Sequence, residues 1–170
     1  MPHDLSPAQG WRAMSARDLD RVVEIAAIGF PDHFEGRDCF DNRLGLYPDG
    51  CFVLEGGEGI EGYLVAYPWR AHAAPALNTT IAAIPADAQA LYLHDLALTP
   101  AVRGQGWSRP AMTRVVARAK AEGLSTVALV AVNDAVDFWR GHGFEVEQAP
   151  EMTAKLASYG SDARYMTRSA

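Results

Sequence analysis

The chain has 170 residues, of which 49% are hydrophobic and 21% charged, and its formal net charge is −6. This length and composition predict one globular domain over residues 1–170. An acidic chain without a basic stripe is poorly suited to bind nucleic acid nonspecifically, so we expect no nucleic-acid partner. No apolar run approaches the roughly 18 residues of a membrane span. The first ten residues, MPHDLSPAQG, lack the regions of a secretion signal, which predicts a cytoplasmic protein away from the membrane.

The sequence offers no metal site. Its two cysteines, Cys39 and Cys51, show none of the short spacings that metal ligands have. We expect each of them to be a small core or surface residue rather than a nucleophile, and we expect no bound metal.

Helix and strand signals fill the first half of the chain. In order, they predict a strand at Gly10–Met14, a helix capped by Ser15 and Asp18 that ends near Gly29, a helix over about Gly36–Leu46, and strands at Cys51–Glu55 and Ile60–Trp69. The Gly-rich tetrapeptide between the last two strands is typical of a hairpin. The following residues, 70–89, contain two prolines and show no sustained period.

The second half is organised around Leu91–Leu98, which is apolar at nearly every position and is predicted to be a buried strand. A helix is predicted from Ser108 to about Glu122, and a short helix at Ala135–His142 with Gly143 as its cap. Strands are predicted at Val127–Val132, at Phe144–Glu147, and in the tail Tyr159–Ser169, which closes the sheet. The Val127–Val132 strand should lie parallel to Leu91–Leu98, because a helix crosses over between them.

The turn after Leu91–Leu98 has the chemistry of an anion site. Its residues, Arg103-Gly104-Gln105-Gly106-Trp107-Ser108, lead into a helix whose first N–H groups have no partner inside the helix. Glycines allow close approach of the backbone to a ligand, and Arg103 and Arg109 can add charge-assisted hydrogen bonds. The turn therefore predicts a pyrophosphate site. It lacks the Gly-Lys-Ser/Thr of a P-loop, and its glycine spacing disfavours a dinucleotide-binding oxidoreductase.

Two motifs resemble those of one enzyme family. The run LALTPAVRGQGWS is similar to the acyl-CoA-binding motif of the GNAT (Gcn5-related) N-acetyltransferases, Arg/Gln-x-x-Gly-x-Gly/Ala, with Ser108 at the last position. About thirty residues later, VNDAVDFWRGHGF (Val132 to Phe144) resembles the second signature of the same family. Two matches in the right order are far more specific than either one alone.

The resemblance implies a mixed α/β (α+β) fold. Its sheet would be twisted, mostly antiparallel and built of about six to seven strands, with helices on both faces and one splayed parallel pair. It also implies that acetyl-CoA lies along that pair. Its pantetheine arm would pair with the backbone of Leu96, Ala97 and Leu98, and its pyrophosphate would meet the N–H groups of Gly104, Gln105, Gly106, Trp107, Ser108 and Arg109. Asn133 either contacts the cofactor or caps the short helix that follows it.

The implied reaction is transfer of an acetyl group to a primary amine by direct attack on the thioester, which requires a base. Three residues of the central strand are candidates. Strict alternation puts Tyr92 and His94 on one face with Leu96 and Leu98, and Asp95 on the other with Ala97, so the Tyr92 face should carry no carboxylate. His94 is the first choice because its usual pKa is near 6.5. Asp95 acting through a water is the alternative, and Tyr92 would more readily hold a water than take a proton.

Several alternatives stay open at this stage. Trp139 stands where the family often has a tyrosine that protonates the departing thiolate; an indole cannot do this at neutral pH, so Trp139 is expected to be a wall of the acyl pocket. A non-catalytic acyl-CoA-binding or sensor module is therefore the alternative function. The acceptor, a small-molecule or peptide amine, is not identified, and a homodimer is left open. The segment 70–89 either flanks the acceptor pocket or is a tolerated insertion.

Overall fold

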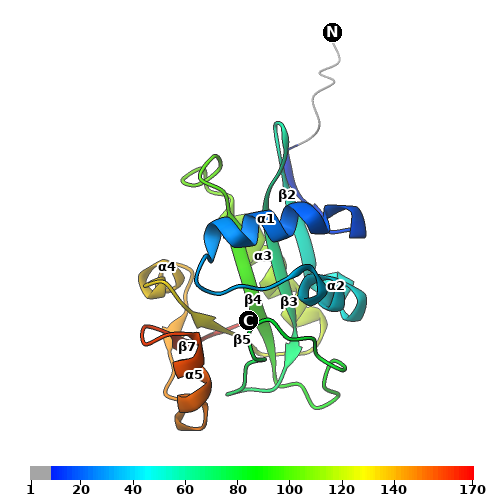
Figure 1. The fold of residues 1–170 in the computed structure, drawn as a ribbon. Helices are drawn as coiled ribbons and strands as arrows, with labels where there is room; N and C mark the ends of the chain where they lie inside the picture. The colour runs from blue at the N-terminus through cyan, green and yellow to red at the C-terminus, as the bar shows by residue number, and fades with distance from the viewer. Residues whose placement is uncertain (1–8) are drawn as a thin grey trace.

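The computed structural model describes residues 9–170, which are organised around a seven-stranded sheet (Figure 1). The strands are β1 (Gly10–Ala13), β2 (Cys51–Gly56), β3 (Gly59–Trp69), β4 (Ala90–Leu98), β5 (Thr126–Ala131), β6 (Glu145–Val146) and β7 (Arg164–Ser169). They lie in the order β1-β2-β3-β4-β5-β7-β6, and every neighbouring pair is antiparallel except β4 and β5. The predicted sheet is thereby confirmed. Most of the decapeptide inspected for a secretion signal, residues 1–8, lies outside the described residues.

Helices cover both faces of the sheet, as predicted. They are α1 (Leu19–Gly29), α2 (Arg37–Leu46), α3 (Ser108–Ala121), α4 (Val136–Arg140) and α5 (Thr153–Tyr159), with short 3-10 helices at Ala16–Asp18, Pro48–Gly50 and Pro150–Met152. In Figure 1, α1 and α2 lie in front of the sheet and α3 lies behind it. The front core contains Tyr63 and Tyr67 of β3, whereas Leu64 and Ala66 belong to the core on the α3 side. This alternation is what a strand buried on both faces requires.

The C-terminal region differs from the prediction. The tail strand begins at Arg164 rather than at Tyr159, because Gly160 has a φ of +127° and turns the chain. Before it lies α5, which is not predicted from the sequence. This helix has seven residues, too few to be stable alone, and it is held by packing of Tyr159 into the front core.

Strand β4 contains a β-bulge. Val65 of β3 pairs with Asp95 and the next residue, Ala66, pairs with Leu93, so His94 is an extra residue without a partner of its own in β3. An extra residue interrupts the alternation of side chains along the strand. As a result His94 and Asp95 both reach the front face, where they contact Tyr67 and Tyr63 respectively.

The predicted division of β4 into faces is therefore wrong. Tyr92, His94 and Asp95 share the front face, while Leu96 and Leu98 pack against the core on the α3 side. The expectation of no carboxylate on the Tyr92 face fails for the same reason. Strict alternation holds only in a regular strand, and no glycine or proline in β4 marks the bulge.

Strands β4 and β5 pair at only two positions, Leu91 with Val127 and Tyr92 with Ala128, and then part. The rest of β4 thus has a free edge on this side. The Thr99 N–H donates to the carbonyl of Glu61 in β3, at 2.9 Å. Because backbone groups alternate in direction along an antiparallel strand, those of Leu98 and Leu96 point away from β3 into the gap, and those of Ala97 point toward β3.

The chain packs so tightly beside the bulge that Gly50 has no room for a side chain. A Cβ at this position would lie 1.8 Å from the carbonyl oxygen of Ala66, a contact that no structure tolerates. We expect Gly50→Ala to lower the free energy of unfolding by about 2 kcal/mol or more, measured by urea denaturation. The control is Gly45→Ala within α2, where a Cβ has nothing within 4 Å; it should raise stability by about 0.5–1 kcal/mol. Equal stability of the two variants would contradict this packing.

Candidate functional site

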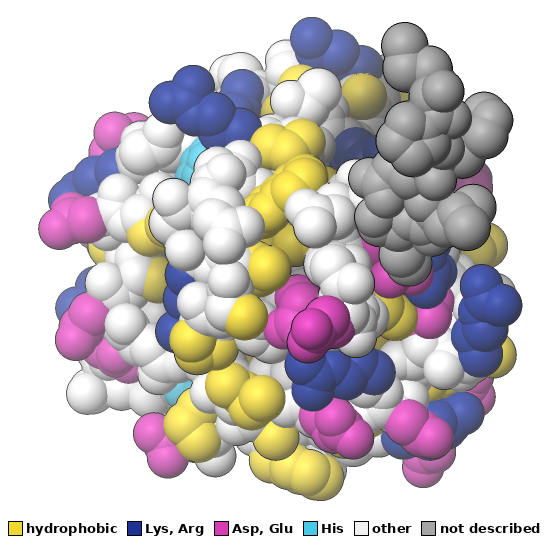
Figure 2. All heavy atoms as spheres, turned by 90° about the horizontal axis from the view of Figure 1, so that it is seen from above, with side chains coloured by type: hydrophobic (Ala, Val, Ile, Leu, Met, Phe, Trp, Pro, Cys, Tyr) yellow, Lys and Arg dark blue, Asp and Glu magenta, His cyan; other side chains and the backbone are white. Residues whose placement is uncertain are grey.

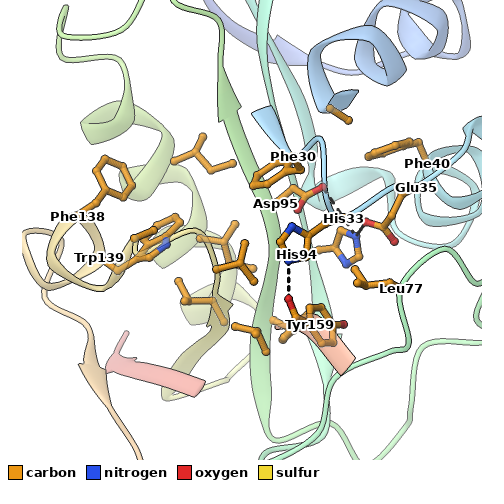
Figure 3. Close-up of a pocket in the computed structure, with 18 residues that line it drawn as sticks. Phe30, His33, Glu35, Phe40, Leu77, His94, Asp95, Phe138, Trp139 and Tyr159 are labelled. Carbon is orange, nitrogen blue, oxygen red and sulfur yellow. Dashed lines mark hydrogen bonds and ion pairs between the residues drawn. The ribbon is translucent and has the colours of Figure 1, made fainter. Parts of the chain in front are cut away.

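A pocket opens where β4 and β5 part (Figure 3). One wall comes from β5 and α4, including Phe138 and Trp139; the other comes from β4, from the loop between α1 and α2, and from Leu77 and Tyr159. The pocket contains about 830 Å³ of empty space, part of it open to solvent. Its lining is mostly apolar, with a few polar side chains gathered on one side.

Three of these polar side chains form a cluster, which Figure 3 shows between Phe30 and Leu77. Glu35 reaches it from the loop before α2, and His94 and Asp95 reach it from the bulge. His94 Nε2 lies 2.6 Å from Glu35 Oε1 and 3.9 Å from Asp95 Oδ2. The side chains of Glu35 and His94 are only 5% and 6% exposed, and that of Asp95 is 15% exposed. The bulge is what brings the second carboxylate to this point.

Both ring nitrogens of His94 are already in hydrogen bonds. Nε2 meets Glu35, and Nδ1 lies 3.0 Å from the hydroxyl of Tyr67. Burial alone would lower the pKa of His94, but the negative charges of Glu35 and Asp95 outweigh it and raise that pKa above its usual value. Burial likewise opposes ionisation of Glu35, yet the charge and hydrogen bond of His94 hold the pKa of Glu35 below its usual value. The two side chains therefore form a buried ion pair.

Asp95 has a different environment. Its Oδ2 accepts a 2.8 Å hydrogen bond from Tyr63, and within residues 9–170 no hydrogen bond reaches its Oδ1. Burial raises the pKa of Asp95 to about 6, while the charges of His94 and Glu35 act on it in opposite directions. The site thus holds a carboxylate with one free oxygen and a pKa close to neutrality.

His33 adds a fourth polar group from the loop before α2. Its Nε2 lies 2.5 Å from the carbonyl oxygen of Tyr159. A carbonyl can only accept, so Nε2 carries the hydrogen, and in the neutral ring Nδ1 is an acceptor. Nδ1 is buried and has no hydrogen-bond partner in the part of the chain that the structure describes.

The segment 70–89 supports the cluster from behind. Leu77 lines the pocket, and the Asn78 N–H donates to Glu35 Oε2 at 3.2 Å. The buried guanidinium of Arg43 donates to the carbonyl of Thr79 at 2.5 Å and lies over the ring of Tyr67. The segment therefore reaches the pocket at Leu77 and anchors the side chain of Glu35.

The turn between β4 and α3 has the form that the sequence predicts. Gly104 and Gly106 have φ values of +77° and +86°, and a Cβ at either would meet nothing within 4 Å. No side chain caps α3, so the N–H groups of its first turn remain open. Arg103 Nε donates to the Leu98 carbonyl at 2.8 Å, and Ser108 Oγ lies 3.1 Å from His142 Nε2. An exposed, glycine-lined helix N-terminus thus continues the free edge of β4.

Two other predicted residues are placed as follows. Tyr92 is buried in the front core beside the pocket. Asn133 is exposed and has a φ of +56° at the end of β5. The residue that precedes α4 is Ala135, and no side chain caps that helix, so the alternative that Asn133 caps it is wrong.

Sequence reasoning missed several of the residues that enter the pocket from outside β4. Glu35, His33, Leu77 and Tyr159 are separated from the bulge by up to about 65 residues in the chain. None belongs to a recognisable motif, and a lone acidic residue in a loop carries no signal. Only the packing of α2 and of the segment 70–89 against β4 brings them together.

The cluster also has the spacing of a metal site, since one ligand atom from each of Glu35, His94 and Asp95 lies within 4.8 Å of the others. The sequence predicted no metal. A metal ion at this point would have to replace the hydrogen bond between Glu35 and His94, because no other nitrogen of His94 is free.

Comparison with known proteins identifies the family. The model of the acetyltransferase (GNAT) family matches residues 18–144, and the chain belongs to that family. A search of curated protein sequences finds no match. Across residues 9–170 no helix has both the length and the apolarity that crossing a membrane requires.

Solved structures share the fold at low sequence identity. Ard1 from Thermoplasma volcanium has a TM-score of 0.72 and 15% identity, over 96% of this chain and 99% of that one. The GphF GNAT-like decarboxylase in complex with isobutyryl-CoA has a TM-score of 0.74 and 20% identity, over 94% and 98%. Arabidopsis thaliana Naa50, in complex with the bisubstrate analogue CoA-Ac-MVNAL, has a TM-score of 0.70 and 11% identity, over 96% and 100%.

The raised pKa of Asp95 predicts a stability change with pH. An unfolded Asp ionises near pH 3.9, whereas the folded one retains its proton to about pH 6, so wild-type stability falls between these values and then levels off. We expect Asp95→Asn, which can still accept from Tyr63, to be more stable than wild type above pH 6 by about 1–3 kcal/mol. The advantage should shrink toward pH 4. Urea denaturation across this range measures it, and a difference that does not change with pH would count against the buried carboxylate.

Proposed function

We propose that this chain is an acetyl-CoA-dependent N-acetyltransferase that transfers the acetyl group to a primary amine. The observation that carries the proposal is the continuous path formed by the open N-terminus of α3, the free edge of β4 and the pocket at Asp95. A diphosphate, an amide-bearing arm and a reactive thioester require these three features in this order. The family and the acyl-CoA complex among its structural relatives support the same donor.

The donor site uses mainly backbone groups. In this proposal the pyrophosphate lies at Gly104–Arg109, where open N–H groups and the helix dipole favour negative charge. The pantetheine amides pair with Leu96 and Leu98, whose backbone groups point into the gap. The backbone of Ala97 is directed toward β3, so its contribution is limited to forming the strand.

We assign the general base to Asp95, the second choice from the sequence, rather than to His94. Neither nitrogen of His94 is free to take a proton from an amine, whereas Asp95 Oδ1 is unoccupied. Asp95 removes a proton from the ammonium, directly or through a water, and the neutral amine attacks the thioester carbon. The carbon–sulfur bond then breaks and CoA leaves as a thiolate. The new amide nitrogen loses its second proton to water, and the thiolate takes up a proton from water. The Glu35–His94 pair lies beside Asp95 and positions it.

Trp139 bears on the alternative function, an acyl-CoA-binding module without turnover. It lines the pocket at the position where the resemblance leads one to expect an acidic tyrosine, and its indole cannot supply a proton. In the proposed mechanism Trp139 is a wall of the acyl pocket. Acetyl-CoA binding without CoA release for any amine would favour the binding module instead.

Gly106→Glu should abolish acetyl-CoA binding, because a carboxylate would occupy the open space in which the pyrophosphate is proposed to lie. The matched control is Gly123→Glu at the opposite end of α3. Gly123 also has a positive φ, +72°, and open surroundings, so it carries the same backbone strain and the same added charge. Isothermal titration should show wild-type affinity for the control and no binding for Gly106→Glu. Equal affinities would place the diphosphate elsewhere.

Asp95→Asn should lower kcat by roughly 10²–10⁴-fold while leaving the Kd for acetyl-CoA unchanged, because it removes only the base. For the wild type, kcat/KM should fall as the pH drops through about 6, where Asp95 becomes protonated. This inflection should be absent in the variant. Asp20→Asn is the control, since that side chain is 86% exposed on α1. If Asp95→Asn kept both wild-type turnover and its pH profile, another group would be the base.

A further inference from the structure

We propose that the acceptor is a small monoamine whose single ammonium group is carried on an apolar body. This inference rests on the proposed function and narrows its acceptor. It follows from the charge balance of the pocket, from the hydrogen-bonding atoms left free in it, and from the nature of its remaining walls.

The pocket offers one unpaired negative charge. Among the described residues that line it, Glu35 and Asp95 are carboxylates, and His94 faces both of them. Glu35 and His94 neutralise one another at 2.6 Å, which leaves Asp95. A ligand with one positive charge therefore completes the balance, and a second positive charge would be buried without a partner.

The free polar atom on this side of the pocket is an acceptor. Asp95 Oδ1 can receive a hydrogen bond, as an ammonium group requires, whereas the unpartnered Nδ1 of His33 is buried. A carboxylate requires donors, yet no Lys or Arg is among the residues that line the pocket. The buried guanidinium of Arg43 does not line the pocket and is directed toward Thr79 and Tyr67 instead. The site therefore favours an amine over an amino acid of the same skeleton.

The other walls are apolar, and so is the entrance. Phe30, Leu77 and Phe138 surround the rest of the space. Figure 3 shows Phe138 facing the polar cluster across it, beside Trp139, the proposed wall of the acyl pocket. Phe138 is also 47% exposed, so it extends this surface toward solvent. Figure 2 shows hydrophobic side chains gathered in a band along the middle of one face of the molecule. Peptide amides following the amine would lose hydration here without gaining partners.

Matched acceptors test this on the full chain, with CoA release from acetyl-CoA followed by a thiol reagent. Phenethylamine is compared with phenylalanine, which adds a carboxylate, and hexylamine with 1,6-diaminohexane, which adds an ammonium. Phenethylamine is also compared with the peptide Phe-Ala-Ala. We expect kcat/KM to be at least 10-fold higher for the apolar monoamine in each comparison. Equal or better turnover of the amino acid, the diamine or the peptide would overturn the inference and leave the acetyltransferase intact.

A binding measurement tests the proposed class of acceptor independently of the proposed catalysis. Phenethylamine should bind the CoA-loaded protein at least 10-fold more tightly than phenylalanine in isothermal titration. If it does so while no amine is acetylated, the inference about the ligand holds and the proposed catalysis fails. If phenethylamine binds no better than phenylalanine and no apolar amine is turned over, the inference is wrong.

A charge placed in the pocket provides a second test. Leu77→Arg adds a cation beside Glu35 and His94, next to which Figure 3 shows Leu77. It should lower the preference for phenethylamine over phenylalanine at least 10-fold, whereas Leu77→Met, of similar size and uncharged, should retain it. An unaltered preference in Leu77→Arg that still binds acetyl-CoA would contradict the charge argument. If Leu77→Arg does not fold, the acceptor comparison on the wild type decides alone.

Discussion

The ion pair between Glu35 and His94 is the interaction on which the chemistry of this pocket depends. Taking both charges out of water is unfavourable, and their 2.6 Å contact offsets that only because Tyr67 and the Asn78 N–H satisfy the remaining groups. His94 shares the front face with Tyr92, as regular alternation requires. The extra residue of the β-bulge brings Asp95 to that face as well, so this irregularity in β4 places the free carboxylate beside the ion pair.

This arrangement gives the two carboxylates opposite properties. Glu35 faces a cation at hydrogen-bond distance and is held ionised, whereas Asp95 is 3.9 Å from the same ring and becomes protonated near pH 6. Pairs of acids whose environments separate their pKa values are typical of catalytic sites. Burial of Asp95 lowers the free energy of unfolding, and it does so most above about pH 6, where the side chain is ionised and can act as a base.

The sequence predicted the parts of the molecule that depend on local chemistry. The glycine turn at Gly104–Gly106, the crossover to a parallel strand and the Schellman cap at Gly143 can each be inferred from a few adjacent residues, and each is present. The bulge could not be predicted, because no residue type in LYLHDLAL distinguishes a bulged strand from a regular one. Nor could the roles of Glu35 and His33, which depend on a loop more than fifty residues away folding over β4.

The same contrast explains why the proposed donor half of the site can be predicted from the sequence and the proposed acceptor half cannot. The proposed donor site consists of main-chain groups in one continuous stretch, so it requires a recognisable pattern of glycines and a strand. The acceptor side consists of side chains from the α1–α2 loop, the segment 70–89, β4, α4 and α5. Each of these can change without disturbing the strand that holds the donor. Structures with 11–20% identity share the fold of this chain, and a shared fold does not determine the acceptor. For this chain, the charges and apolar walls of its own pocket are the better guide to the acceptor.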